Sequence, residues 1–554
     1  MNVRLQILAF SLSIVTTIAC VAEKPVAADF QPPVHAVPPA TPLIGTLSIR
    51  PRQLQIEEYV RANFIPPLSD AFPTFNFDYV SDATNLIPVR RGLIPVKQSR
   101  FDFLLGPGRI WQDGDGEVQA SIPFTLMSRE VNCTHNGLLK FTLVRGKAGE
   151  PQPGSLLINQ ETCHFLKFDM WGAVSVVYTP AALPLAKQII ADFRDEVAAR
   201  IPTKAYADFA KDYPQVDLAR FSAGLPDDDD LSIHGIYFEG VHYTGDCRTR
   251  SGAYPYCGQM MLTSFSTAKT AYPAVVMMAL AQEYGLDIYQ QKIMDYLPEA
   301  SSAKGNWREV TFGQTGDMAT GNFLDPSPAA DQVAPMFFGE VDAADKLRAA
   351  FELPNGTRAG EKVVYLTSDT YVLVSAMDAY LRVKNAKITD SFEYLVQNVL
   401  KPLQVSPDVW LSRRTRDNGI YNSGRAFGGY GMFWNSDSIV KVARLLALDA
   451  GKIRGRQILH PKALAATMQQ DPEDRGLSMD YYGFYYNNGT WALPARLLGE
   501  QYHCDPWVTV MTGLSGIRVI MMPNGLIFYF FNDAQAFPLA DQIEAANQVR
   551  PFCL

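Results

Sequence analysis

The sequence predicts an α+β protein in which a β-rich accessory domain precedes an antiparallel sheet covered by helices. Three observations predict this. The chain has 554 residues, too many for one ordinary hydrophobic core, so two folded units are expected. Segments rich in Val, Phe, Thr and Tyr gather in the first half. The second half has strand patterns at both ends and helical patterns between them.

The first 22 residues are typical of an export signal. Arg4 is followed by an apolar stretch, 5–19, that is too short to span a bilayer comfortably. Two cleavage alternatives stay open. Residues 17–20 (Thr-Ile-Ala-Cys) resemble a bacterial lipobox, which would lipidate Cys20 and attach the chain to a membrane, whereas ordinary cleavage would follow Ala22 or Ala28. Both alternatives predict an exported protein of the bacterial periplasm.

Residues 23–42 are rich in Pro and Ala, which predicts an extended tether rather than a packed segment. The β-rich accessory domain is expected over residues 43–224. Its predicted strands are 116–127, 137–144 and 165–178. A helix should follow, because apolar residues recur every fourth position from Leu185 to Ile201. Gly224-Leu225-Pro226 mark the expected boundary.

The second domain is expected over residues 225–554, and we found no internal repeat. Its predicted elements are a strand pair at 233–244, a buried helix at 265–284 that Pro273 should bend and Gly285 should end, a helix at 438–448 ended by Gly451, and a hairpin whose strands 508–522 and 526–531 flank Asn524-Gly525.

Cysteine parity agrees with export. Setting Cys20 aside leaves six cysteines, and an even number in an exported chain suggests disulfides. The expected pairs are Cys133–Cys163, Cys247–Cys257 and Cys504–Cys553. Six cysteines allow 15 connectivities, and six buried free thiols are the alternative.

Charge and histidine content limit the partners. The net charge of −8 comes without a basic stripe, so no nucleic acid is expected to bind. The seven histidines are scattered, and His234 and His242 fall within a predicted strand pair, so we expect neither a metal nor another cofactor.

The strongest chemical motif is Ser266-Thr267-Ala268-Lys269. On a helix, Ser-x-x-Lys places both side chains on one face, one turn apart. A serine hydroxyl needs an adjacent base, and a lysine in an apolar site loses its proton near neutral pH. A helix start also offers free backbone N–H groups that bind an oxyanion.

The same pattern occurs twice more, at 301–304 and 438–441. The first continues directly into Gly305-Asn306, with no helix to present it. The second opens a helix and is the real competitor, although a serine at a helix start followed by a surface lysine explains it as well. The motif at Ser266 precedes a long apolar helix and also has two partner motifs downstream in the expected order.

Further segments agree with this motif in their order along the chain. They are 317–321 (Asp-Met-Ala-Thr-Gly), Tyr365-Leu366-Thr367, 369–373 (Asp-Thr-Tyr-Val-Leu), 428–433 (Gly-Gly-Tyr-Gly-Met-Phe) and Thr512-Gly513-Leu514. With them, residues 230–540 resemble the serine β-lactamase and penicillin-recognising superfamily. Within it they resemble the class C β-lactamase-like esterases and amide hydrolases, including aminohexanoate-oligomer hydrolases. The first 200 residues lie outside the resemblance.

The resemblance implies a β-lactamase/transpeptidase-like fold and a role for each matched residue. Ser266 would be the nucleophile, Lys269 would keep the proton network poised, and Tyr365 would pass a proton to the leaving group. The backbone N–H groups of Ser266 and Leu514 would form the oxyanion hole. Thr367, Thr512 and Gly513 would line the substrate site.

Several positions depart from the family pattern. Thr367 stands where Asn or Ser is usual, and Met511 stands where Lys or His opens the third motif. Because methionine cannot pair with a carboxylate, β-lactam hydrolysis and D-Ala-D-Ala recognition should be poor. Ser368-Asp369 is a competing second motif. Arg518 could replace the missing lysine, or could be an ordinary strand arginine.

The sequence therefore predicts an exported serine hydrolase that cleaves an ester or amide bond in a small-molecule or peptide substrate through an acyl-Ser266 intermediate. Two alternatives remain: a D,D-peptidase or β-lactamase, and a non-catalytic binding or sensor protein that retains the fold.

Overall fold

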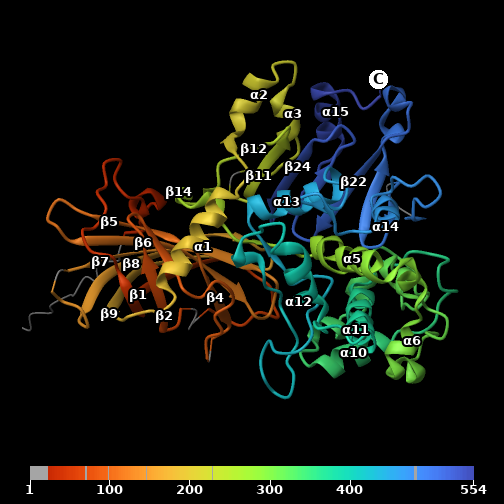
Figure 1. Cartoon of the computed structure of the whole chain (residues 1–554), viewed down its shortest axis with the longest axis horizontal. Helices are drawn as coiled ribbons and strands as arrows, with labels where there is room; N and C mark the ends of the chain where they lie inside the picture. The colour runs from red at the N-terminus through yellow and green to blue at the C-terminus, as the bar shows by residue number, and fades with distance from the viewer. Residues whose placement is uncertain are drawn as a thin grey trace, which may run out of the picture.

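A computed structural model describes residues 23–68, 72–97, 99–144, 146–227, 229–479 and 483–553 (Figure 1). The predicted export signal and Cys20 lie outside these residues. Two large sheets form separate parts of the molecule, and the helical region lies beside the second one. The predicted α+β architecture, with a β-rich unit ahead of an antiparallel sheet covered by helices, is confirmed.

The first sheet has nine strands among the described residues and closes on itself. Its order is β4-β6-β5-β3-β2-β1-β9-β8-β7, and β6 also pairs with β7, which closes a barrel. The strands are β1 (Ile44–Arg61), β2 (Phe75–Ser81), β3 (Asn85–Pro88), β4 (Phe101–Leu105), β5 (Gly108–Gln112), β6 (Val118–Ser128), β7 (Thr134–Leu143), β8 (Pro151–Thr162) and β9 (Leu166–Pro180).

An aromatic cluster fills this barrel. Phe72 makes edge contacts with Phe75, Phe103 and Phe124, and Phe75 stacks on Phe103 with 4.1 Å between ring centroids. The three strands predicted in this half are confirmed as β6, β7 and β9, and the predicted helix as α1 (Ala186–Ala198). The other strands were not predicted.

The proline-rich segment packs more closely than the sequence predicted. Residues Ala27–Phe30 form a short 3₁₀ helix, and both Ala27 and Phe30 are buried. Ala27 N donates to Ser251 O at 3.0 Å, and Lys140 Nζ donates to Asp29 O at 2.7 Å. The expectation of an unpacked tether is therefore wrong for these residues, because burial of the Phe30 ring offsets the cost of ordering the chain.

The second sheet, also nine-stranded in the described part of the chain, has the order β10-β12-β11-β24-β23-β22-β21-β20-β19. All its pairs are antiparallel except β10 with β12. The strands are β10 (Thr203–Ala205), β11 (Leu231–Phe238), β12 (Val241–Thr244), β19 (Leu477–Ser478), β20 (Tyr485–Asn487), β21 (Thr490–Pro494), β22 (Trp507–Gly513), β23 (Ile517–Met521) and β24 (Ile527–Asn532).

Helices cover both faces of this sheet. In β24, Phe528 and Phe530 belong to one apolar cluster, whereas Tyr529 and Phe531 belong to the other, as the two-residue repeat of a strand requires. The first face packs against α2 (Phe209–Asp212), α3 (Leu218–Ser222) and α15 (Ala540–Val549), and the second against α13 (Ser436–Ala447). Figure 1 shows these helices beside β24.

The remaining helices lie mostly in a region below the second sheet in Figure 1. They are α4 (Thr267–Lys269), α5 (Val275–Tyr284), α6 (Ile293–Tyr296), α7 (Phe312–Gly316), α8 (Ala330–Val333), α9 (Met336–Gly339), α10 (Ala343–Phe351), α11 (Thr367–Val383), α12 (Ser391–Leu395) and α14 (Pro461–Thr467). No described helix is long and apolar enough to cross a membrane.

Two sequence predictions needed refinement here. The helix predicted at 265–284 is present as α4, the π-helical turn η4 (Thr270–Ala274) and α5, because Pro273 removes a backbone donor and the turn widens around it. The predicted strand 508–522 is wrong: β22 and β23 occupy it, with a turn at 514–516 between them. Gly513 and Gly516 flank this turn, and Gly516 has φ +112°, a conformation that favours glycine. The hairpin at Asn524-Gly525 joins β23 to β24.

The second sheet recruits residues from before the boundary expected at 224/225. Strand β10 pairs with β12, and α3 packs against α15. Gln542 Nε2 on α15 donates to Ala223 O at 2.8 Å. These contacts place residues 203–222 with the second sheet.

All three predicted disulfides are confirmed. Cys133–Cys163, Cys247–Cys257 and Cys504–Cys553 have Cα–Cα distances of 5.1, 5.3 and 5.6 Å. The cysteines of the first two belong to or pack against one apolar cluster that includes residues of the barrel and of the second sheet.

Candidate active site

The segment that presents Ser266 is held in an unusual conformation. Strand β15 (Leu262–Thr263) ends just before it, pairing with β16 (Phe433–Trp434). Phe265 has φ +36°, in the left-handed region that non-glycine residues seldom adopt. This turn brings the half-buried Ser266 to the start of α4. Strain of this kind is typical of functional sites.

Lys269 reaches back along the helix to Ser266. Its Nζ lies 2.8 Å from Ser266 Oγ, the contact that the Ser-x-x-Lys spacing predicted. Lys269 is only 1% exposed. Burial lowers the pKa of Lys269 to about 8, opposed by the negative charge of Asp331. The amine is thus able to act as a base near neutral pH.

Two further oxygens complete the surroundings of this amine. Lys269 Nζ donates to Thr367 Oγ1 at 2.9 Å and to the Gly429 carbonyl at 3.3 Å. Gly429 has to be glycine, because a Cβ there would lie 2.4 Å from Thr370 Oγ1 and 2.7 Å from Thr367 Cγ2. The structure therefore brings Thr367 together with Lys269, although the two are 98 residues apart.

The aromatic ring of Tyr365 faces the amine of Lys269. Lys269 Nζ is 4.7 Å from the Tyr365 ring centroid. The ring also contacts Trp491 and Tyr486, with centroid distances of 5.3 and 5.9 Å. The Ser266 hydroxyl and the Tyr365 ring therefore both lie beside the amine of Lys269.

The end of β22 passes beside Ser266. A Cβ on Gly513 would lie 2.8 Å from Ser264 O and 3.3 Å from Ser266 N, so only glycine allows this approach. Thr512 is half-buried and bonds Ile517 O at 3.2 Å, while Leu514 is 40% exposed. Met511 belongs to the apolar core and is fully buried.

The lysines of the two competing Ser-x-x-Lys motifs pair with carboxylates rather than with the serines of those motifs. Lys441 Nζ pairs with Asp437 at 2.7 Å and donates to Gln404 O, while Ser438 is fully buried. Lys304 pairs with Glu352 at 2.5 Å on the surface.

Asp369 and Arg518, which the sequence also offered as candidates, make hydrogen bonds within the protein. Asp369, of the competing Ser368-Asp369 motif, accepts from Thr320 Oγ1 at 3.3 Å. The Arg518 guanidinium donates to the Phe537 carbonyl at 2.6 Å and, more weakly, to the Pro538 carbonyl at 3.3 Å.

Sequence reasoning missed two residues of this site. Gly429 lay in the noted glycine-rich segment but had no role assigned to it. Asp331, on the short helix α8, accepts from Thr367 N at 2.7 Å and from Thr367 Oγ1 at 2.6 Å. No motif or periodic pattern surrounds Asp331 in the sequence, so only the three-dimensional contact reveals it.

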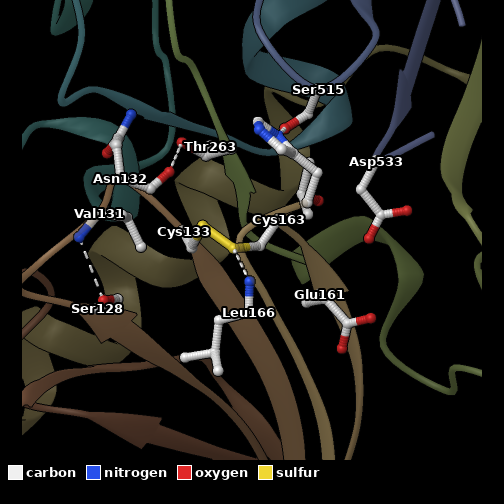
Figure 2. Close-up of a disulfide and its surroundings, with 12 residues drawn as sticks. Ser128, Val131, Asn132, Cys133, Glu161, Cys163, Leu166, Thr263, Ser515 and Asp533 are labelled. Carbon is white, nitrogen blue, oxygen red and sulfur yellow. Dashed lines mark hydrogen bonds between the residues drawn. A yellow bond between two sulfur atoms is a disulfide. The ribbon is translucent and has the colours of Figure 1, made fainter. Parts of the chain in front are cut away.

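Two loops of the barrel contact the segments that hold the candidate active site. Thr263 Oγ1 donates to Asn132 O next to the Cys133–Cys163 disulfide, as Figure 2 shows. The ring Nδ1 of His164 and Ser515 Oγ are 2.7 Å apart. The strand before Ser266 and the turn at Leu514 therefore each contact one of the two barrel loops that the Cys133–Cys163 disulfide links.

No protein-family profile and no curated protein sequence matches this chain. Solved structures are similar to it in part. A family VIII carboxylesterase is 18% identical, covering 61% of this chain and 97% of its own, with a TM-score of 0.42. A D-stereospecific amidohydrolase from Streptomyces is 15% identical, covering 59% and 98%, with a TM-score of 0.42. A penicillin-binding protein homolog from Caulobacter crescentus is 17% identical, covering 60% and 96%, with a TM-score of 0.40.

Proposed function

We propose that the protein is an exported serine hydrolase that cleaves an ester or amide bond through an acyl-enzyme on Ser266. The observation that carries this proposal is the 2.8 Å contact between Ser266 Oγ and the buried amine of Lys269. A buried amine with a pKa of about 8 supplies the base that a serine nucleophile requires. Export to the periplasm is supported by the three disulfides, which persist in oxidising compartments.

In the first step, neutral Lys269 accepts the proton of Ser266. The Oγ electron pair then forms a bond to the carbonyl carbon of the substrate, and the carbonyl electrons move onto its oxygen. Two backbone N–H groups, those of Ser266 and Leu514, are proposed to bind this oxyanion. The close approach of Gly513 to Ser266 N supports that assignment, because it brings the Leu514 backbone to the same side of the nucleophile.

Collapse of the tetrahedral intermediate expels the leaving group, which needs a proton. We assign the transfer of this proton to Tyr365, whose ring lies 4.7 Å from Lys269 Nζ and so borders the same proton network. The proton that Lys269 took from Ser266 then returns to Tyr365. Water attacks the acyl-Ser266 ester and gives one proton to the neutral amine of Lys269, which passes it to Ser266 Oγ as the acyl group leaves as the acid. Thr367 and Thr512 would contact the substrate.

The substrate class proposed is a small ester, amide or peptide without a required carboxylate. Met511 is buried in the core, and the Arg518 guanidinium donates to backbone carbonyls. Met511 therefore cannot hold a substrate carboxylate, which disfavours the D,D-peptidase or β-lactamase alternative. Membrane attachment through a lipidated Cys20 stays a prediction.

The test is acylation of the full chain by p-nitrophenyl butyrate, followed by release of p-nitrophenol and by intact mass. Wild-type protein should give turnover and a transient mass increase of one butyryl group, and Ser266→Ala should lose both. Ser438→Ala is the matched control, since Ser438 opens the competing Ser-x-x-Lys motif but has no lysine partner. It should hydrolyse the ester at the wild-type rate. Full hydrolysis by Ser266→Ala would reject the proposal.

Two further probes separate the alternatives. A chromogenic cephalosporin should be turned over slowly, and turnover as fast as that of the ester would favour the β-lactamase alternative. A fluorophosphonate should label the wild-type protein, and absence of labelling together with absence of ester turnover would favour a non-catalytic binding protein.

A further inference from the structure

The amine of Lys269 has three oxygen neighbours within hydrogen-bonding distance: Ser266 Oγ, Thr367 Oγ1 and Gly429 O. An ammonium group has three N–H bonds and satisfies all three neighbours. A neutral amine has two N–H bonds and one lone pair, so one neighbour has to become the donor. A carbonyl oxygen cannot donate, which leaves the two hydroxyl groups to compete for the lone pair.

Asp331 decides this competition. Its Oδ2 lies 2.6 Å from Thr367 Oγ1, and its Oδ1 accepts from Thr367 N at 2.7 Å. An ionised carboxylate accepts hydrogen bonds only, so the single hydroxyl hydrogen of Thr367 is committed to Asp331. Thr367 Oγ1 then accepts from Lys269. Of the three oxygen neighbours, Ser266 Oγ is then the one with a hydrogen to offer the lysine lone pair.

We propose that Asp331 is a positioning residue for the acylation step, whose carboxylate acts through the Thr367 hydroxyl to direct the lone pair of neutral Lys269 at the hydroxyl of Ser266. The inference rests on the proposed hydrolase function and adds a residue to it. The Ser266 proton moves to Lys269 Nζ while the Oγ electrons form the bond to the substrate carbon, and no other reagent takes part.

The charged and titratable groups around this network come from several elements. Lys269 and the Tyr365 ring face each other, and Asp331 also interacts with Asp369 on α11 and with Tyr430. Burial raises the pKa of Asp331, whereas Lys269 and the Thr367 hydrogen bonds lower it. The negative charge of Asp331 in turn raises the pKa of Lys269.

A purely structural role for Asp331 makes a different prediction. Thr367 is the first residue of α11, so Asp331 also satisfies a backbone donor at that helix start. Loss of this anchor alone would lower stability, and loss of the charge would lower the pKa of Lys269. Neither would lower the rate on the high-pH plateau, where the amine is already neutral. The plateau rate therefore separates the two roles.

The experiment measures the single-turnover acylation rate of the full chain with p-nitrophenyl butyrate between pH 5.5 and 10. In Asp331→Asn, the amide N–H can donate to Thr367 Oγ1 and release the threonine hydrogen toward the lysine lone pair. The rate on the high-pH plateau should fall at least about tenfold, a part of the roughly 10²–10⁴-fold that a well-placed general base contributes. The midpoint should shift to lower pH because the negative charge is gone, and KM should change little.

Two threonine variants test the relay itself. Thr367→Val removes the hydroxyl and should lose a similar part of the plateau rate, with the midpoint near its wild-type value because Asp331 keeps its charge. Thr367→Ser keeps the hydroxyl and should retain most of the rate. If Asp331→Asn does not fold, the comparison of these two variants decides, and equal rates in both would overturn the proposal.

Asp378→Asn is the matched control. Asp378 is another buried carboxyl on α11, bonded to Ser391 N at 2.8 Å and paired with Arg425 at 3.2 Å. This variant should lose stability and keep both plateau and midpoint. A plateau within twofold of wild type in Asp331→Asn, or a lowered plateau with an unshifted midpoint, would overturn the proposal. Failure of the hydrolase function is seen separately, as equal turnover by wild type and Ser266→Ala.

Discussion

At the scale of single residues, Lys269 sets the pH at which the proposed chemistry operates. Burial lowers the pKa of Lys269 to about 8 against the opposing charge of Asp331. Only the neutral amine accepts the Ser266 proton. At pH 7 the neutral fraction is roughly one in ten for such a pKa.

The first prediction follows from this shift. The kcat/KM of wild-type protein for a neutral ester should rise with pH, reach half of its plateau near pH 8 and stay level above it. The sign follows from the lysine: protonation at low pH removes the base. A rate measurement from pH 5.5 to 10 checks this, with the uncatalysed ester hydrolysis subtracted at each pH. A profile that is flat, or that falls between pH 7 and 9, would contradict the assignment of Lys269 as the base.

How much of the site the sequence could predict depends on how local each signal is. Ser266 and Lys269 are one helical turn apart, so their contact follows from spacing alone. Thr367 and Tyr365 were found through motif order, because nothing in local spacing brings them to Lys269. Asp331 lies on a helix of four residues, α8, and reaches the site only through tertiary packing.

At the scale of elements, the sequence predicted those with a strong repeat and missed those without one. The apolar spacing from Leu185 to Ile201 identified α1, and the apolar run before Gly285 identified α5. Strand β1 was missed because its second half, from Arg50 on, is largely exposed and carries charged residues. The run 508–522 was taken as one strand, because the turn between β22 and β23 is signalled only by its two flanking glycines.

The loops of the barrel that meet at the Cys133–Cys163 disulfide are the element on which the active site rests. One loop accepts a hydrogen bond from Thr263 at Asn132 O (Figure 2). The other loop contacts Ser515 through His164. The disulfide ties these two loops together. Loosening it should therefore displace the approach to Ser266 and the turn next to Leu514 at the same time.

The second prediction compares two disulfides. Replacing Cys133 and Cys163 by serine should lower kcat for the ester severalfold and also lower the melting temperature. Replacing Cys504 and Cys553 by serine is the control, because that disulfide lies near the start of β22, about 20 Å along the strand from Gly513 at 3.3 Å per residue. Loops of 30 and 49 residues imply similar entropic effects on the unfolded chain, about 4 kcal/mol each. Equal kcat in both double variants would show that the barrel loops do not position the site.

At the scale of the whole molecule, the barrel and the second sheet share one apolar core and several buried polar contacts. Arg91, which follows β3 of the barrel, pairs with Asp408 at 2.6 Å and with Glu196 of α1 at 3.1 Å. Ser406 Oγ donates to Glu196 at 2.9 Å. The side chains of Arg91, Glu196 and Asp408 are each 11% exposed or less. Their ion pairs therefore form a buried junction between the barrel and the part of the molecule that contains the second sheet. The two parts should consequently unfold together.

The last prediction concerns this junction. Arg91→Ala removes the cation that joins the buried carboxylates of Asp408 and Glu196, although Glu196 keeps a longer pair with Arg200 at 3.4 Å. The loss should cost about 3–5 kcal/mol of unfolding free energy. The control is Arg348→Ala, whose partner Asp345 lies in an exposed pair on α10 and should cost less than about 1 kcal/mol. Urea unfolding followed by tryptophan fluorescence measures both. A loss of less than about 1 kcal/mol in Arg91→Ala would mean that the junction does not couple the two parts.

The pH dependence of the same variant gives an independent check of the charge assignment. Burial alone would raise the pKa of Glu196, but the Arg91 guanidinium outweighs it and holds this pKa below its usual value. A carboxyl with a depressed folded-state pKa contributes stability above its unfolded pKa and loses it as the pH falls through the folded value. Wild-type protein should therefore lose unfolding free energy between pH 7 and pH 4. In Arg91→Ala, burial is no longer opposed by that cation, so the pKa of Glu196 should rise. The variant should then lose less unfolding free energy between pH 7 and pH 4 than the wild-type protein does. The unfolding free energies of the variant and the wild type should therefore be closer at pH 4 than at pH 7. A gap that stays constant from pH 7 to pH 4 would mean that Arg91 stabilises the junction by packing its side chain rather than by its charge.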